Sequence, residues 1–267
     1  MPDTVEGPIQ AAELAIFQRK SLSLAAAGAT GLPGRFESFL HDGLRASMAT
    51  AEGYGFLNTI EGLNEKSFEA LPGVLRQFPT QHHPTLVATT PSQSLVDRLL
   101  RDGYSPAPIR PIAYLRPRTS TRSDGSETDE WQIMEVSTQG DAKLFLALLD
   151  GGYAASSEVG ALIRAEHAHP MVRGFIGSRN NQPLAAAAMS LHPTGAVLGG
   201  ASTLSNARGS GAQTALLTHR LQLVRALEIP LVTATAAPGT PSIRNLARLG
   251  FTIVERTAWH LDHTQRT

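Results

Sequence analysis

The sequence contains no cysteine among its 267 residues, which excludes disulfide bonds and cysteine-ligated zinc. It also lacks an excess of either charge, because 23 basic side chains balance 23 acidic ones. A chain without net charge has no general electrostatic attraction to nucleic acid or to an anionic membrane. We therefore expect no nucleic-acid partner, and a polyanionic ligand would have to be held by a local site.

Long apolar runs are absent as well. No segment approaches the ~18 consecutive apolar residues that a membrane span needs. The acidic start of the chain lacks the basic and apolar regions of a secretion signal. These absences predict a cytoplasmic protein with no membrane partner. Apolar residues still make up 42% of the chain, which is enough for a buried core in each half.

One polar stretch divides the chain. Residues 118–130 show no periodicity and contain no large apolar side chain, which is typical of a linker. We therefore predict a first domain at residues 1–117, a linker at 118–130 and a second domain at 131–267.

The second half alternates strand-like and helix-like patterns, which indicates a mixed α/β fold. Strands are expected at residues 131–136, 172–177, 184–191, 196–204, 231–235 and 251–261. Helices are expected at residues 141–149, 158–167, 212–227 and 242–249.

The first half repeats part of this pattern at a constant offset of 147 residues. The segment RLLRDGY at 98–104 aligns with NLARLGF at 245–251, a helix-like stretch at 65–78 with 212–225, and a strand-like stretch at 85–89 with 232–236. Unrelated helix–strand units can look alike by chance. The shared register nevertheless favours two related domains in tandem.

The most informative segment is RGSGAQTALL, residues 208–217, where a strand ends and a long helix begins. Glycines allow a close approach to a ligand, and the first amides of a helix lack internal partners and favour anions. A pyrophosphate fits this arrangement. The loop matches neither the dinucleotide pattern G-x-G-x-x-G, because Thr214 replaces the third glycine, nor the P-loop.

These residues resemble the coenzyme A signature of the GNAT superfamily of N-acetyltransferases, Gln/Arg-x-x-Gly-x-Gly/Ala at a strand-to-helix junction. The segment SIRNLARLGF, residues 242–251, is similar to the last helix of that family. The resemblance implies an α/β fold with mixed sheets, organised as two tandem GNAT-like acyl-CoA N-acyltransferase domains. The first copy would be degenerate.

The resemblance also assigns roles to residues. Backbone amides of residues 209–214 would hold the pyrophosphate, the strand end at 201–203 would pair with the pantetheine arm, and the last helix would flank the thiol. Two central strands would splay apart there and leave a free amide to polarise the thioester. The cofactor-binding residues implied are Ala201, Ser202, Thr203, Arg208, Gly209, Ser210, Gly211, Ala212, Gln213, Thr214, Ser242 and Asn245.

Three positions depart from the family pattern. Gln213 stands where the signature has glycine or alanine, and Gly239 stands where an asparagine often opens the last helix. Leu246 occupies the position of the tyrosine that protonates the leaving thiolate, and leucine has no proton to donate. Another group or water would do that work, or the thiolate would leave unassisted.

Candidate catalytic groups are few. We predict roles for Tyr153, as an acid or a substrate wall, and for Glu158, which could equally be a capping residue. His192 is a further candidate base, or a solvated turn residue. His167 and His169 are also candidates, but their spacing does not place them on one helix face, so we expect no metal site.

The first domain is expected to bind no coenzyme A. Its loop at residues 58–64 has one glycine, and Glu61 and Glu65 would repel a pyrophosphate. We expect this domain to pack on the second and to wall the acceptor pocket.

The sequence thus predicts an N-acetyltransferase that moves an acetyl group from acetyl-CoA to a primary amine of a small molecule, without a metal. The alternatives are a non-catalytic acyl-CoA-binding protein, or a transferase that uses another acyl group or a protein acceptor. Nothing in the sequence indicates the acceptor or the oligomeric state.

Overall fold

The computed structural model describes residues 6–117, 131–153 and 156–261. The first lobe is built on a six-stranded sheet in the order β1-β2-β3-β4-β13-β5. Its strands are β1 (Phe36–His41), β2 (Leu44–Ala49), β3 (Thr59–Glu61), β4 (Thr85–Thr89), β5 (Tyr104–Ala107) and β13 (Arg256–Leu261). Its helices are the short α2 (Leu71–Leu75) and α3 (Gln93–Arg101), and 3-10 turns lie at Gly55–Leu57 and Ser67–Ala70.

The second lobe is built on a seven-stranded sheet in the order β12-β6-β11-β10-β9-β8-β7. Its strands are β6 (Ile112–Leu115), β7 (Gln132–Glu135), β8 (Val172–Arg179), β9 (Gln182–His192), β10 (Gly195–Thr203), β11 (Val232–Thr235) and β12 (Thr252–Val254). Its helices are α4 (Gln139–Tyr153), α5 (Ser157–His167), α6 (Ala212–Ala226) and α7 (Pro241–Arg248), with a 3-10 turn at Ser205–Ala207. The predicted strands and helices of this half are present, with one exception given below.

The two sheets have closely similar topologies. In the first, two antiparallel steps lead to the parallel pair β3–β4; in the second, three antiparallel steps, beginning with β7–β8, lead to the parallel pair β10–β11. Two antiparallel strands follow, β13 and β5 in the first sheet and β6 and β12 in the second. This repeated order confirms the tandem α/β architecture that the internal repeat predicted.

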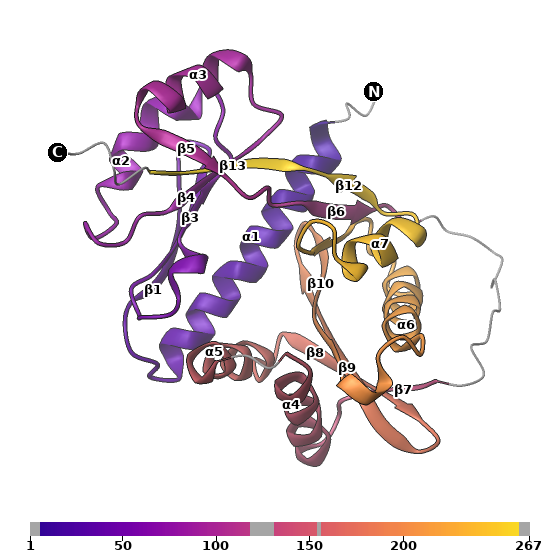
Figure 1. Cartoon of the computed structure of the whole chain (residues 1–267). Helices are drawn as coiled ribbons and strands as arrows, with labels where there is room; N and C mark the ends of the chain where they lie inside the picture. Colours follow the sequence, from indigo (N-terminus) through magenta and orange to yellow (C-terminus); the bar gives the residue numbers. More distant parts are fainter. Residues whose placement is uncertain (1–5, 118–130, 154–155, 262–267) are drawn as a thin grey trace.

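The lobes exchange one strand each. β6 precedes the predicted linker but lies in the second sheet, and β13 ends the described chain but lies in the first sheet (Figure 1). The predicted single strand at 251–261 is therefore wrong. The chain breaks at Glu255 into β12 and β13, because the two pieces pair with different sheets. The division at residues 117 and 131 stays a prediction, and residues 118–130 lie outside the described part of the chain.

The predicted helix at residues 65–78 is also wrong in extent. Only the 3-10 turn Ser67–Ala70 and the five residues of α2 are helical. Pro72 lies in the first turn of α2, and Gly73 lies inside the helix and weakens it. The described segment between β3 and β4 consequently contains no long helix that could present a row of free amides to a phosphate.

Helix α1 (Glu6–Ala29) runs diagonally between the lobes and was not predicted (Figure 1). Ala12 packs near Ile112 of the second sheet, whereas Leu24 packs near Ala49 of the first. Because α1 is covered by both lobes, its apolar residues do not form a single stripe, and the usual helical periodicity is weak. None of the helices in the described ranges has the length and apolar character needed to cross a membrane.

A buried charge network joins α1 to the first sheet. Glu61 is only 2% exposed and forms ion pairs with Lys20 of α1 and with Arg256 of β13, the latter at 2.6 Å. The expectation that Glu61 lies in a phosphate-facing loop is therefore wrong, since it lies in β3. Nearby, Glu13 accepts hydrogen bonds from Arg45 at 2.7 Å and from Thr89 at 2.5 Å.

Candidate functional site

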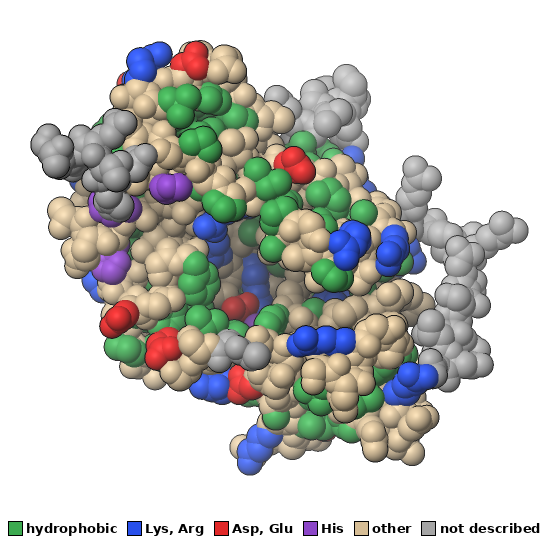
Figure 2. Space-filling model, in the orientation of Figure 1, with side chains coloured by type: hydrophobic (Ala, Val, Ile, Leu, Met, Phe, Trp, Pro, Cys, Tyr) green, Lys and Arg blue, Asp and Glu red, His purple; other side chains and the backbone are tan. Residues whose placement is uncertain are grey.

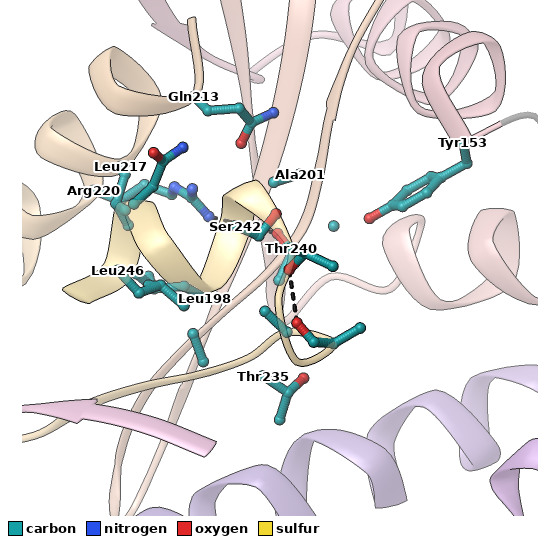
Figure 3. A pocket seen from close by; sticks show the side chains of 16 residues that line it. Tyr153, Leu198, Ala201, Gln213, Leu217, Arg220, Thr235, Thr240, Ser242 and Leu246 are labelled. Carbon is teal, nitrogen blue, oxygen red and sulfur yellow. Dashed lines mark hydrogen bonds between the residues drawn. The ribbon is translucent and has the colours of Figure 1, made fainter. Parts of the chain in front are cut away.

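Strands β10 and β11 diverge at the centre of the second sheet. They pair only where residues 196–198 face residues 232–234. Beyond that point β10 shifts its register against β9 between Gly199 and Ser202. A pocket of about 280 Å³ lies at the opening, between β10, α6 and α7 (Figure 3). The predicted splay of these strands is thus confirmed, while the role of a free amide there stays a prediction.

The loop before α6 leaves the first amides of the helix open. Gly209 and Gly211 have φ values of +79° and +88°, a conformation that side chains disfavour. Gly211 is the N-cap of α6 and provides no side-chain cap. Trp131 fixes the loop in place, since its Nε1 donates a hydrogen bond to the carbonyl oxygen of Ser210 at 2.9 Å. These features give the loop the geometry that the sequence predicted for an anion site, and the binding of an anion there stays a prediction.

This loop opens a second cavity of about 640 Å³. Ala201, Gln213, Ser242 and Asn245 line both cavities, so the space at the start of α6 continues along β10 to the divergence of β10 and β11. The residues predicted to bind the cofactor therefore surround one elongated space. All of them line it except Ser210, whose carbonyl oxygen instead accepts the hydrogen bond from Trp131.

Several of these side chains make specific contacts. Arg208 folds back, and its guanidinium donates to the carbonyl oxygens of Gly152 at 3.2 Å and Thr203 at 3.4 Å. Gln213 is the residue that departs from the family signature. Its side-chain amide donates a hydrogen bond to the Thr203 hydroxyl at 2.9 Å and so links the end of β10 to the start of α6. The Ser202 hydroxyl points away from this space and donates a hydrogen bond to the carbonyl oxygen of Leu148 on α4 at 2.8 Å.

Tyr153, the last residue of α4, points its hydroxyl into the 280 Å³ pocket (Figure 3). Gly152 allows this approach, because a Cβ there would lie 2.1 Å from the Ser202 hydroxyl oxygen. Tyr153 is 40% exposed, but partial desolvation of its phenol, with the charge of Glu166 adding to the effect, raises the pKa of Tyr153 to about 12. The phenol is therefore protonated at neutral pH and can serve as a hydrogen-bond donor.

Glu158 is not brought to this space. It lies exposed in the first turn of α5, where a hydrogen bond from Ser157 lowers the pKa of its carboxyl group. Its backbone carbonyl accepts a hydrogen bond from Tyr54 of the first lobe at 2.5 Å. A catalytic role for Glu158 stays a prediction, and its position corresponds to the capping alternative.

Leu246, at the position of the family's tyrosine, is 6% exposed and belongs to the core of the second lobe while touching the pocket. His192 lies at the end of β9, where it contacts the Ser190 hydroxyl, and burial lowers its pKa to about 4. His169 accepts a hydrogen bond from the amide of Met171. Neither histidine lines the pocket.

Arg220 is a pocket residue that the sequence did not reveal. It is 3% exposed, yet it forms no ion pair with any described carboxylate. Its Nη1 donates to the carbonyl oxygens of Ala188 at 2.8 Å and Gly199 at 3.5 Å, which fixes the irregular part of β10. Burial lowers its pKa to about 10, so it remains charged at neutral pH. The sequence could have indicated that Arg220 is buried, because it lies one helical turn after Leu216 and next to Leu221, both on the apolar side of the predicted helix.

His167 lies directly behind the irregular part of β10. Its Nδ1 is 2.8 Å from the carbonyl oxygen of Ile163, which requires the proton on Nδ1 and leaves the Nε2 lone pair free. Nε2 is buried without a hydrogen-bond partner and faces Gly200. Burial lowers the pKa of the imidazole, so it is neutral at pH 7.

Replacing Gly200 by alanine is expected to destabilise the protein by about 1–3 kcal/mol, as overpacked sites do. Gly200 has a φ of +56°, and its added Cβ would lie 2.0 Å from Nε2 of His167. Gly199→Ala is the matched control, because nothing lies within 4 Å of its Cβ position. Urea denaturation measures both variants. His167→Ala should restore part of the loss in the double variant, and equal stabilities of the Gly199 and Gly200 variants would contradict this packing.

No known family profile and no curated protein sequence matches this chain. Several solved structures, in contrast, superpose on this chain. A GCN5-related N-acetyltransferase from Kribbella flavida superposes with a TM-score of 0.60 at 15% identity, covering 96% of this chain and 97% of that one. A tandem GNAT protein from the clavulanic acid biosynthesis pathway superposes with a TM-score of 0.57 at 15% identity, covering 97% and 95%. The chain therefore has the tandem GNAT fold.

Proposed function

We propose that the second domain binds acetyl-CoA and transfers its acetyl group to a primary amine of a small molecule. One observation carries this proposal: the open amides of α6 and the divergence of β10 and β11 border one continuous space. A diphosphate would lie at the helix start, where the amides and the helix dipole favour negative charge. The pantetheine arm would follow β10, so the thioester would reach the 280 Å³ pocket.

In this arrangement the amine attacks the thioester carbonyl. The nitrogen–carbon bond forms, the carbon–sulfur bond breaks, and the ammonium proton passes to water. Arg220, a buried cation beside the pocket without a carboxylate partner, would stabilise the negative charge that develops on the oxygen and then on the sulfur. The charge is effective there because the surroundings are largely apolar.

Tyr153 would take the place of the tyrosine that is absent at Leu246. A thiol has an ordinary pKa of about 8.5. Because the pKa of Tyr153 is raised to about 12, it would not give up its proton completely to a thiolate. It would instead donate a hydrogen bond to the departing sulfur.

Tyr153→Phe is expected to lower kcat by roughly 10- to 100-fold, at or below the lower end of the effects of a positioned proton donor, because it only donates a hydrogen bond. Affinity for acetyl-CoA should change little, because the diphosphate site is separate. Tyr114→Phe on β6 is the matched control and should leave turnover unchanged. Thiol release measured against acetyl-CoA concentration gives both parameters, and an unaltered kcat in the Tyr153 variant would contradict this role.

A non-catalytic acyl-CoA-binding protein is the second candidate, and the buried Leu246 favours it. The two are separated by incubating the protein with acetyl-CoA and a panel of primary amines while following free thiol. Thiol release that depends on an amine supports the transferase. Tight binding of acetyl-CoA without thiol release with any amine would support the binding protein.

A further inference from the structure

A third cavity, of about 720 Å³, lies between the two lobes. Ile16 and Lys20 of α1 form one wall, the segment at residues 107–111 forms another, and Glu61 and Arg256 of the first sheet close it. Residues 235–237, at the end of β11 and just after it, line both this cavity and the 280 Å³ pocket. The interlobe cavity therefore adjoins the proposed thioester position, and Figure 2 shows a hollow in this face with basic side chains on its walls.

The charges around this cavity do not cancel. Lys20, Arg110 and Arg256 line it, and Glu61 is the one acidic side chain among the described residues that do so. Lys20 and Arg256 both pair with Glu61, and Lys20 also donates to the Thr59 hydroxyl at 2.8 Å. Behind them, Glu13 pairs with Arg45 at 2.7 Å and lies 3.8 Å from Arg256. The cluster thus keeps an excess of positive charge that faces the cavity.

Arg110 is the cation of this cluster that has no carboxylate partner among the described residues. It forms no ion pair with any described residue, and its guanidinium has one hydrogen bond there, to the Thr85 hydroxyl at 3.4 Å. Its backbone is fixed on both sides, because its amide donates to the carbonyl oxygen of Arg256 and its own carbonyl accepts from the Arg256 side chain, each at 2.9 Å. Burial lowers the pKa of this guanidinium even with Glu61 nearby. A partly buried arginine without an acidic partner is costly unless an anion pairs with it.

We propose that this interlobe cavity binds the carboxylate of the acceptor, so that the substrate is an amino carboxylate whose amine reaches past residues 235–237 to the thioester. This inference rests on the proposed transferase function. A planar carboxylate can accept two parallel hydrogen bonds from the guanidinium of Arg110, whereas a bulkier dianionic phosphate would also approach the buried carboxylate of Glu61. The pocket would select substrates through a bidentate pairing of guanidinium and carboxylate.

The test measures binding of small probes by saturation-transfer NMR, without coenzyme A. The probes are linear amino carboxylates from glycine to 5-aminovalerate, alkylamines of the same lengths, and 3-aminopropylphosphonate. We expect at least one amino carboxylate to bind about 10-fold or more tightly than its matched alkylamine, as a charge-assisted pair allows. Arg110→Gln should remove this preference and Arg110→Lys should keep part of it.

Arg101→Gln is the matched control, because Arg101 is an exposed arginine on α3 outside the cavity. It should retain the wild-type preference. Acetyl-CoA binding is titrated in parallel, so that a failure of the proposed function is seen separately. The inference is overturned if no amino carboxylate binds at millimolar concentration, if alkylamines or the phosphonate bind as tightly, or if Arg110→Gln keeps the preference.

Discussion

Replacing Gly211 by glutamate is expected to weaken acetyl-CoA binding by on the order of 1,000-fold, because two like charges about 4 Å apart repel by about 4 kcal/mol near a protein surface. Gly211 caps α6 at the mouth of the 640 Å³ cavity, where the free amides lie. The fold should survive, since the nearest atom to the added Cβ is 4.0 Å away. Isothermal titration calorimetry measures the affinity, and circular dichroism confirms the fold.

Gly211→Asn separates charge from backbone strain. The φ of +88° disfavours both substitutions, but asparagine tolerates this region better than most residues and adds no charge. We expect the asparagine variant to lose far less affinity than the glutamate variant. Equal losses would indicate a steric effect, and undiminished binding by the glutamate variant would contradict the placement of the diphosphate.

Glu61→Gln is expected to destabilise the protein by about 3–5 kcal/mol, the range found when one partner of a buried ion pair is removed. Two cations, Lys20 and Arg256, would lose the carboxylate that pairs with both of them. Because Lys20 belongs to α1 and Arg256 to the exchanged strand β13, the loss should loosen the contact between the lobes. Urea denaturation measures this change.

The same network predicts a pH dependence. Burial alone would raise the pKa of Glu61, but the charges of Lys20 and Arg256 outweigh it and hold the pKa well below the ordinary value. The carboxylate therefore contributes stability above the ordinary pKa of about 4.3, and this contribution is lost as the pH falls below it toward the folded-state pKa. Between pH 5 and 3 the wild type should lose more stability than the Glu61→Gln protein.

Glu69→Gln provides the control for both measurements. Glu69 pairs with Arg98 at 2.8 Å, but its side chain is 73% exposed. A surface pair of this kind contributes about 0–1 kcal/mol. If Glu61→Gln cost no more than Glu69→Gln, the buried network would not hold the lobes together.

The sequence predicted what local patterns encode. The loop at Gly209 and Gly211, the start of α6 and the hairpin strands β8 to β10 all follow from turn residues and from periodicities that span few positions. The offset of 147 residues predicted the tandem repeat, because both copies keep the order of strand and helix. The placement of Tyr153 at the pocket also agrees with its candidate role.

What depends on distant contacts could not be predicted in this way. The exchange of β6 and β13 is fixed by pairing between strands far apart in the chain, which no local pattern records. Helix α1 was missed because both lobes cover it, and Glu61 was placed in a loop because its partners, Lys20 and Arg256, are remote in sequence. The interlobe cavity at Arg110 exists only once these elements assemble.

The central claim is that the open amides of α6 hold the diphosphate of an acyl-CoA. Calorimetric titration of the wild-type protein with acetyl-CoA, and separately with S-acetylpantetheine, tests it most directly, because the second compound has the thioester arm without the diphosphate. We predict saturable binding of acetyl-CoA and much weaker binding of S-acetylpantetheine. No heat with millimolar acetyl-CoA, or equal affinity for the two compounds, would contradict the claim.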